Sequence, residues 1–162
     1  MMERSLILIK PDGVKRGVMG KIISRFEDAG YKIIGAKMAW IDSEFGKEHY
    51  ADLGQRRGQK VLQVMLKFIT SGPVMALVLE GINAVDGVRK LVGGTEPKSA
   101  APGTIRGDFA HVSFAHADQQ NKAIENLIHA SGSLEEAQLE TALWFKEAEL
   151  HSYRNVHEAH TF

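Results

Sequence analysis

One histidine in the C-terminal third of the chain has the surroundings of a nucleophile. His129 stands between the apolar pair Leu127-Ile128 and the small residues that run from Ala130 to Ser133, just before an amphipathic segment. A neutral imidazole can attack phosphorus with one ring nitrogen while the other nitrogen donates a hydrogen bond that fixes the tautomer. A histidine that only packs or caps a helix would show the same local pattern, so residues elsewhere must decide.

Two other stretches contain residues suited to phosphate. Lys10 follows a short apolar run, which places it at the exit of a predicted strand, and Arg106 stands in the segment Pro102-Gly103-Thr104-Ile105-Arg106-Gly107-Asp108. The planar fork of arginine matches phosphate oxygens, and lysine adds a mobile point charge. Glycines near Thr95 and Thr104 let backbone groups approach an anion closely. Alternatively, Arg106 pairs with Asp108 and Lys10 is a solvated strand end.

The common nucleotide-binding signatures are absent from the sequence. There is no Gly-x-x-x-x-Gly-Lys-Ser/Thr stretch and no Gly-x-Gly-x-x-Gly opening, which argues against a P-loop or a Rossmann domain. The chain also has no cysteine, which excludes a thiolate nucleophile and thiolate metal sites. Transfer through a phosphorylated side chain is therefore favoured, with His129 as the carrier.

The elements that must position these residues alternate between strands and helices. Hydrophobic periodicity, turn residues and caps predict a mixed α/β chain in which Pro11-Asp12-Gly13 is a turn and 54–60 is a loop. A brief strand follows Phe109, and residues 117–122 form a polar surface insertion. Strands are predicted at 5–10, 31–41 and 74–79, and helices at 18–29, 43–51, 61–70, 83–92 and 134–143. The glycine-rich loop 93–107 is long enough to need a functional explanation.

Composition limits the function further. The 162 residues are 44% hydrophobic, which suffices for one domain with its own core. Twenty basic residues balance twenty acidic ones, so no broad positive surface for nucleic acid is expected. The N-terminal apolar run is too short for a signal peptide, and the run Val74–Leu79 is too short to span a bilayer. We therefore expect a soluble cytoplasmic protein without nucleic-acid or membrane partners.

In their order along the chain, these motifs resemble those of the nucleoside diphosphate kinase family, over nearly the whole length. The resemblance rests on Ile9-Lys10-Pro11-Asp12-Gly13-Val14, Arg16-Gly17, His49-Tyr50, Ser71-Gly72-Pro73-Val74, Gly103-Thr104-Ile105-Arg106-Gly107-Asp108-Phe109, Asn126-Leu127-Ile128-His129-Ala130-Ser131 and Trp144-Phe145. It implies a ferredoxin-like α/β (α+β) sandwich, with a four-stranded antiparallel sheet covered by helices. Residues 1–162 would form one domain with a surface insertion at about 113–125 and a C-terminal tail at 154–162.

The resemblance also implies an activity. The γ-phosphate of a nucleoside triphosphate would pass to His129 and then to a nucleoside diphosphate, in a ping-pong reaction with broad base specificity. Mg2+ would arrive bound to the nucleotide, with no metal ligand from the protein. The family forms homo-oligomers, and because the loop 93–107 matches a loop at subunit contacts, a hexamer is preferred over a tetramer.

Roles for single residues follow from the same resemblance. The positions that match phosphate-binding residues of the family are Lys10, Tyr50, Arg89, Thr95 and Arg106. Asn126 matches a residue that binds the ribose, while Ser131 and Glu140 match a pair that orients the histidine. Taken without the resemblance, Tyr50 is equally a core aromatic, and Arg89 and Glu140 are equally solvated helix residues.

Three departures from the family pattern stand out. The family usually stacks the base on an aromatic residue, but the corresponding stretch here is Gln59-Lys60-Val61-Leu62, so apolar contact without stacking is expected. Gly132 replaces an aspartate found in many relatives, and the insertion at 113–125 is long. A catalytically silent nucleotide-binding relative therefore stays a rival hypothesis. A nucleic-acid-binding module is disfavoured by the neutral charge and the lack of an aromatic RNA-reading motif.

Overall fold

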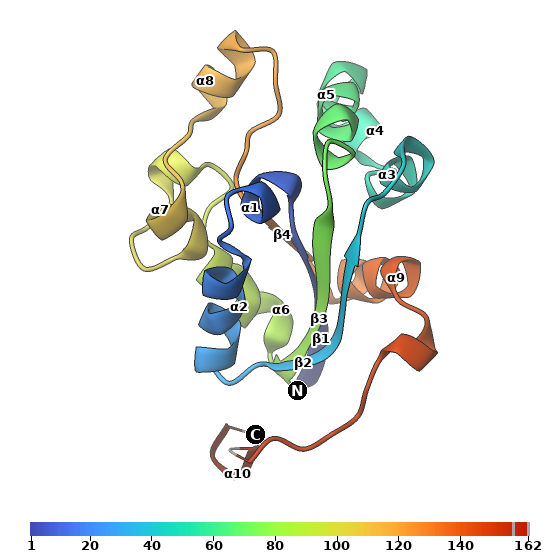
Figure 1. Ribbon diagram of the computed structural model, residues 1–162, viewed down its shortest axis with the longest axis vertical. Coiled ribbons are helices and arrows are strands. Elements are labelled where there is room, and N and C mark those ends of the chain that lie inside the picture. The colour runs from blue at the N-terminus through green and yellow to red at the C-terminus, as the bar shows by residue number, and fades with distance from the viewer. Residues whose placement is uncertain (157, 162) are drawn as a thin grey trace.

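The computed structural model describes residues 1–156 and 158–161, and its centre is a four-stranded antiparallel sheet (Figure 1). The strands are β1 (Met2–Ile9), β2 (Lys32–Ala39), β3 (Val74–Ile82) and β4 (Ile128–Ala130), in the order β2-β3-β1-β4. Helices cover both faces of this sheet (Figure 1). The expected α+β class and ferredoxin-like sandwich are confirmed.

Strand β1 forms the centre of the core because both of its faces are apolar. Leu6, Ile7, Leu8 and Ile9 are all fully buried, and alternate side chains point to opposite faces of the sheet. Ile7 and Ile9 belong to one core cluster, while Leu6 and Leu8 belong to the other. β1 pairs with β3 along its length and with β4 through Leu8, which lies opposite His129.

Different helices cover the two faces. Helices α2 (Met19–Asp28) and α6 (Ala84–Val92) pack on the face of Ile7 and Ile9, through residues such as Phe26 and Val88. The opposite face is covered by the end of α9 (Leu134–Trp144), through Trp144 and the following Phe145, with α3 (Ser43–His49) beside it. The predicted helices in these regions are confirmed to within a few residues.

Apart from the 11-residue helix α5, the remaining elements are short, and some of them were mispredicted. They are α1 (Pro11–Lys15), α4 (Leu53–Arg57), α5 (Gln59–Ile69), η1 (Pro97–Ser99), α7 (Ile105–Phe109), α8 (Phe114–Gln119), η2 (Glu147–Glu149) and α10 (Glu158–Thr161). The turn expected at 11–13 starts α1, and the loop expected at 54–60 contains α4. The brief strand expected directly after Phe109 is not formed, since residues 110–113 have no regular structure and α8 begins at Phe114. Helices of about five residues are too short for a 3.6-residue hydrophobic period to appear.

The C-terminal segment packs against β2. The backbone N–H of His151 donates to Ile34 O at 2.7 Å, and the hydroxyl of Tyr153 donates to Ile33 O at 2.6 Å. Further on, Glu158 of α10 lies 3.2 Å from the ammonium group of Lys32. The expected tail 154–162 therefore contains a helix that contacts the sheet. His157 and Phe162 in this segment lie outside the described residues.

None of the described helices is both long and apolar enough to cross a bilayer.

Candidate active site

A cleft of about 1120 Å³ opens above the sheet, and His129 lies within its lining. β4 positions His129 there because the strand pairs with β1. His129 lies opposite Leu8, on the face of the sheet that α9 covers. The cleft brings together seven residues that the sequence analysis named, and these are Lys10, His49, Tyr50, Thr95, Asn126, His129 and Glu140. They come from segments far apart in the sequence, so only the folded chain forms the site.

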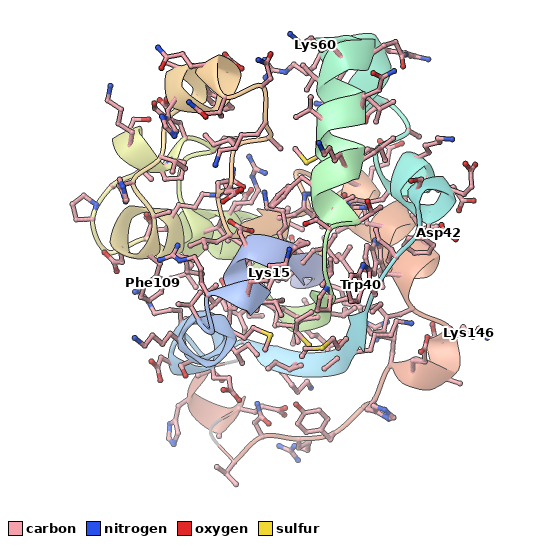
Figure 2. The ribbon with its side chains drawn as sticks, turned by 45° about the horizontal axis from the view of Figure 1, so that its top comes forward. Lys15, Trp40, Asp42, Lys60, Phe109 and Lys146 are labelled. Atoms are coloured by element: carbon pink, nitrogen blue, oxygen red, sulfur yellow. The ribbon has the colours of Figure 1, made fainter. Side chains whose placement is uncertain are left out.

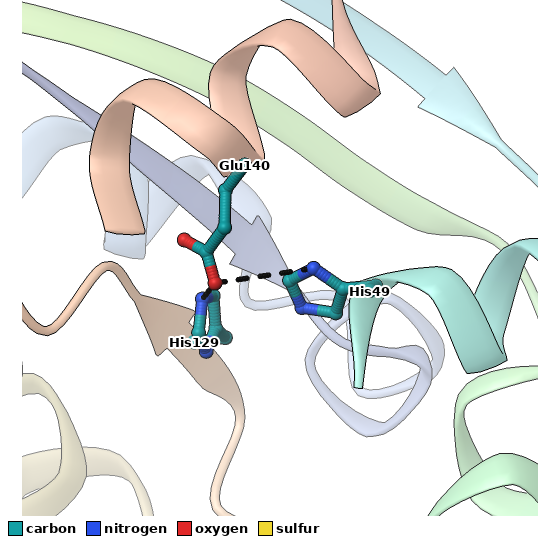
Figure 3. A group of neighbouring side chains, drawn as sticks. All are labelled: His49, His129 and Glu140. Carbon is teal, nitrogen blue, oxygen red and sulfur yellow. Dashed lines mark hydrogen bonds and ion pairs between the residues drawn. The ribbon is translucent and has the colours of Figure 1, made fainter. Parts of the chain in front are cut away.

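Glu140 of α9 holds the imidazole of His129 in one orientation (Figure 3). Its Oε1 lies 2.8 Å from His129 Nε2, and its Oε2 accepts a 2.5 Å hydrogen bond from the hydroxyl of Ser131. Ser131 Oγ in turn accepts from the backbone N–H of Leu6 at 3.2 Å. Since a carboxylate accepts, Nε2 carries the proton, and Nδ1 keeps its lone pair on the side away from Glu140.

The charge of Glu140 is maintained despite its partial burial. Burial alone would raise the pKa of Glu140, but the hydrogen bond and the charge of His129, together with the hydrogen bond from Ser131, lower it below the ordinary value. The carboxylate is therefore ionised at neutral pH. It can stabilise positive charge that develops on the ring when Nδ1 acquires a substituent.

A second histidine, His49, packs against the first. The two rings meet edge to face with centroids 4.9 Å apart, and the side chain of His49 is fully buried. The indole N–H of Trp144 donates to His49 Nδ1 at 3.3 Å, so the proton of this neutral ring resides on Nε2. Burial, with repulsion from His129, lowers the pKa of His49 to about 3. The sequence analysis missed this role because His49 appeared there only as the neighbour of Tyr50.

Lys10, Asn126 and Thr95 form a polar group on the same cleft wall. The ammonium group of Lys10 donates to Asn126 Oδ1, and Asn126 Nδ2 donates to Thr95 O at 2.7 Å. Burial lowers the pKa of Lys10 to about 8, with Asp12 opposing the shift and Arg106 adding to it. Lys10 therefore remains mostly charged near pH 7 and can bind an anion in the cleft.

Arg106 lies behind this wall and does not line the cleft. Its guanidinium donates to three backbone carbonyls, Asn126 O at 3.2 Å, Gly93 O at 3.0 Å and Ile128 O at 2.6 Å. These bonds fix the segment that leads into β4. Burial, with repulsion from Arg89, lowers the pKa of Arg106 to about 10. Like Arg106, Arg89 lies outside the cleft lining. The alternative ion pair of Arg106 with Asp108 is not formed, because Asp108 pairs with Arg25 instead.

The approach to β4 contains an unusual backbone conformation. Leu127 has φ of +72°, which residues with a side chain rarely adopt. Asp12 Oδ2 accepts the N–H of Leu127 at 2.9 Å, and the N–H of Lys10 donates to Leu127 O at 2.8 Å. The N–H and the carbonyl of Leu127 are thus both hydrogen-bonded to residues that directly follow β1. Asp12 was quoted in a motif, but no role had been predicted for it.

Tyr50 and Gly132 complete the comparison with the sequence predictions. Tyr50 packs its ring against His49 at 4.6 Å, and burial raises the pKa of its phenol, so the hydroxyl stays protonated. Next to Gly132, whose N–H donates to Glu136 Oε2 at 2.8 Å, the carboxylate of Glu136 lines the cleft. An acidic group is therefore present beside the position where the sequence lacks an aspartate.

Among the described residues, one group has the spacing of a metal site. Ligand atoms of His49, His129 and Glu140 lie within 4.8 Å of one another. Mg2+ requires mostly oxygen ligands, whereas this group offers two imidazoles and a single carboxylate. Moreover, His49 Nδ1 already accepts from Trp144, and Glu140 Oε1 accepts from His129. These residues do not fit Mg2+.

The chain thus combines an α+β sandwich with a cleft in which Glu140 orients His129 and Lys10 offers a positive charge. The family model described as nucleoside diphosphate kinase matches residues 3–150. The chain is 42% identical to the nucleoside diphosphate kinase of Borreliella burgdorferi, over 98% of this chain and 96% of that protein. It is 49% identical to the nucleoside diphosphate kinase of Pyrococcus horikoshii, over 93% and 90%.

Solved structures agree with these sequence matches. A transition state mimic of the Borrelia burgdorferi nucleoside-diphosphate kinase, with bound vanadate and ADP, superposes with a TM-score of 0.96 at 41% identity, covering 99% of this chain and 96% of that one. The Halobacterium salinarum enzyme in complex with CDP gives a TM-score of 0.84 at 40% identity, covering 98% and 97%. The chain belongs to the nucleoside diphosphate kinase family. It is a phosphotransferase that acts in nucleotide metabolism.

Proposed function

We propose that this chain moves the γ-phosphate of a nucleoside triphosphate to a nucleoside diphosphate in two steps, through a phosphohistidine on His129. The observation that carries the proposal is the 2.8 Å contact between His129 Nε2 and Glu140 Oε1. This contact supports a proton on Nε2 and a lone pair on Nδ1, which would be the nucleophile in the cleft that His129 lines. Ser131 supports the reaction by holding the second oxygen of Glu140.

The two steps balance without any further reactant. The lone pair of His129 Nδ1 attacks the γ-phosphorus, the bond from that phosphorus to the bridging oxygen breaks, and the nucleoside diphosphate leaves with the electron pair. A terminal oxygen of a second diphosphate then attacks the phosphorus on Nδ1, and the N–P bond breaks. Glu140 stabilises the ring while it is positively charged.

Cations near the reacting phosphorus provide most of the catalysis. Charge spreads over the phosphoryl oxygens in the transition state, and fixed positive groups stabilise it without reorganisation. Lys10 is the charged group on the cleft wall nearest Asn126, while Tyr50 and Thr95 offer hydroxyl donors. Arg89 and Arg106 are the other phosphate-binding residues that the family resemblance predicts. Neither lines the cleft, and the guanidinium of Arg106 donates to three backbone carbonyls.

The substrates are nucleoside triphosphates and diphosphates with any base. Contacts to phosphates and to the ribose, which Asn126 would bind, are shared by all nucleotides, and this supports broad base specificity. The bound ADP and CDP of the two relatives support the same view. Mg2+ is expected on the nucleotide phosphates, where it neutralises their charge, because it dehydrates reluctantly and prefers phosphate oxygens. A homo-oligomer, as a hexamer, and a cytoplasmic location stay predictions.

Phosphate labelling tests the proposal directly. The protein is mixed with magnesium and γ-labelled ATP without an acceptor, and an acid-labile phosphoprotein is sought. We expect the native chain to take up label and to release it when a nucleoside diphosphate is added. His129→Ala should take up none, because the attacking nitrogen is gone.

The matched control is His116→Ala, which removes an exposed histidine of α8 and should label like the native chain. A folded native chain that binds ADP but never becomes labelled would contradict the proposal. That result would favour the catalytically silent relative.

A further inference from the structure

The two ends of the cleft differ in chemistry. The inner end, next to β4, contains the buried polar side chains of Lys10 and Asn126 beside His129. The outer end is lined by residues of α5 and α8, two helices whose ribbons stand apart at the top of Figure 1. A nucleotide has the same division, with charged phosphates at one end and a flat, largely apolar base at the other.

Two large apolar side chains are exposed at the outer end. Phe114, the first residue of α8, is 45% exposed, and Val61 on α5 is 43% exposed, and both line the cleft. Exposed apolar side chains inside a cleft mark a surface that a ligand can cover. They come from different helices, α8 and α5, that both contribute to the lining of this cleft.

Phe114 is held in position by the same loop that supplies Thr95. The backbone N–H of Phe114 donates to Glu96 Oε1 at 2.9 Å. Ser113 caps α8 by accepting the N–H of His116 at 3.2 Å. Across the opening, Lys60 at the outer end of α5 reaches Asn121 Oδ1 at 3.5 Å (Figure 2). The aromatic ring is therefore attached to a fixed backbone rather than to a free loop.

We propose that Phe114 is the base-stacking residue of this enzyme, with Val61 as the opposite wall. The insertion at 113–125 thereby supplies the aromatic surface that the stretch around Val61 lacks. This inference rests on the proposed function, because it assigns the outer end of the same cleft to the nucleotide base. Stacking reads the face of a base and not its edge, so it accepts purines and pyrimidines alike.

Calorimetric titration with ADP tests the assignment on the full chain. Phe114→Ala is expected to raise the Kd for ADP about tenfold, because removing the aromatic ring on which a base stacks typically weakens binding by about this factor. Phe114→Tyr should bind like the native chain, and Phe114→Leu should lie between the two. The control is Ile82→Ala, which removes an apolar side chain of similar exposure (43%) outside the cleft and should leave the Kd unchanged.

A second measurement separates stacking from general damage to the site. Phosphorylated protein is prepared, and its dephosphorylation by ADP is compared with its spontaneous hydrolysis by water, in which no base takes part. The ratio of the two rate constants should fall about tenfold in Phe114→Ala. A fall in both rates together would indicate a structural role and overturn the inference.

The outcomes for the two proposals are distinguishable. If Phe114→Ala binds ADP within twofold of the native chain, the inference is wrong, while phosphohistidine formation can still support the kinase. If no phosphoprotein forms but Phe114→Ala weakens ADP binding and Ile82→Ala does not, the kinase proposal fails and the base site stands.

Discussion

The two histidines at the inner end of the cleft have different surroundings and different roles. His129 presents a charged carboxylate to one nitrogen and keeps the other nitrogen free. His49 is kept neutral by burial and by the hydrogen bond from Trp144. A protonated His49 would repel the ring of His129 and compete for Glu140, whose Oε1 lies 3.9 Å from His49 Nδ1. Its neutrality thus reserves Glu140 for His129.

The buried neutral His49 predicts an acid-sensitive stability. Its pKa is about 3 in the folded chain and near 6.5 in the unfolded chain, so the unfolded state binds more protons between these values. The free energy of unfolding should therefore fall as the pH drops from about 6.5 toward 3. We expect this fall to be shallower in His49→Gln, measured by urea denaturation at a series of pH values.

The interval from pH 6.5 to 5 isolates the effect of His49. The lowered pKa of Glu140 also makes stability decline on acidification, but only below the ordinary value of 4.5. His116→Gln, at an exposed site, is the control and should keep the native slope. A His49→Gln variant with the native slope would show that His49 does not remain neutral in the folded chain.

At the scale of elements, helix α9 links stability to the site. It carries Glu140 near its middle and Trp144 at its end, and its first turn is capped by Ser133, whose Oγ accepts the N–H of Glu136 at 3.1 Å. Acidic side chains at Glu135 and Glu136 complement the positive end of the helix. Glu140 therefore lies on a helix whose start is fixed by the Ser133 cap.

Removing the cap should weaken the fold measurably. Ser133→Ala leaves the N–H of Glu136 without its acceptor, and loss of such a cap typically costs about 1 kcal/mol. We expect the free energy of unfolding, from urea titration at pH 7, to fall by about this amount. Ser133→Asp retains an acceptor oxygen and should stay close to the native value; equal losses in both variants would refute the capping role.

Prediction from the sequence succeeded where a single element carries its own signal. The apolar run before Lys10 and the spacing of Ile22 and Phe26 predicted β1 and α2, because burial leaves a period in the sequence. The roles of His49 and Asp12 were missed, because their partners Trp144 and Leu127 are about a hundred residues away. His129, Lys10 and Arg106 were chosen for their chemistry. The roles of the other site residues were predicted from the family resemblance.

At the scale of the whole molecule, exposed apolar side chains support the predicted self-association. β2 is an edge strand of the sheet, and Met38 and Trp40 at its end are 51% and 69% exposed. Large exposed apolar side chains on an edge strand are typical of contact surfaces between subunits. The C-terminal segment bonds to this edge at Ile33 and Ile34. From the family resemblance, the glycine-rich segment 93–107 is predicted to be a second such surface.

We expect light scattering to give a mass six times the 17.9 kDa of one chain. Trp40→Asp should shift the distribution toward smaller species, because it places a charge in an apolar contact. The control Leu139→Asp changes an equally exposed side chain (67%) that lies in the cleft and should keep the native mass. A native protein that stays at the mass of one chain at every concentration tested would exclude the hexamer.

The order of the strands has a consequence for the order of events during synthesis. β1 leaves the ribosome first, but it lies between β3 and β4 in the finished sheet. Its N–H groups and carbonyls facing β4, such as those of Leu6, find their partners only when Ser131 has been made. Pairing across so long a stretch of chain is slow to form. β4, which carries His129, is therefore expected to join the sheet last. The site around His129 can form only when the nascent chain is nearly complete.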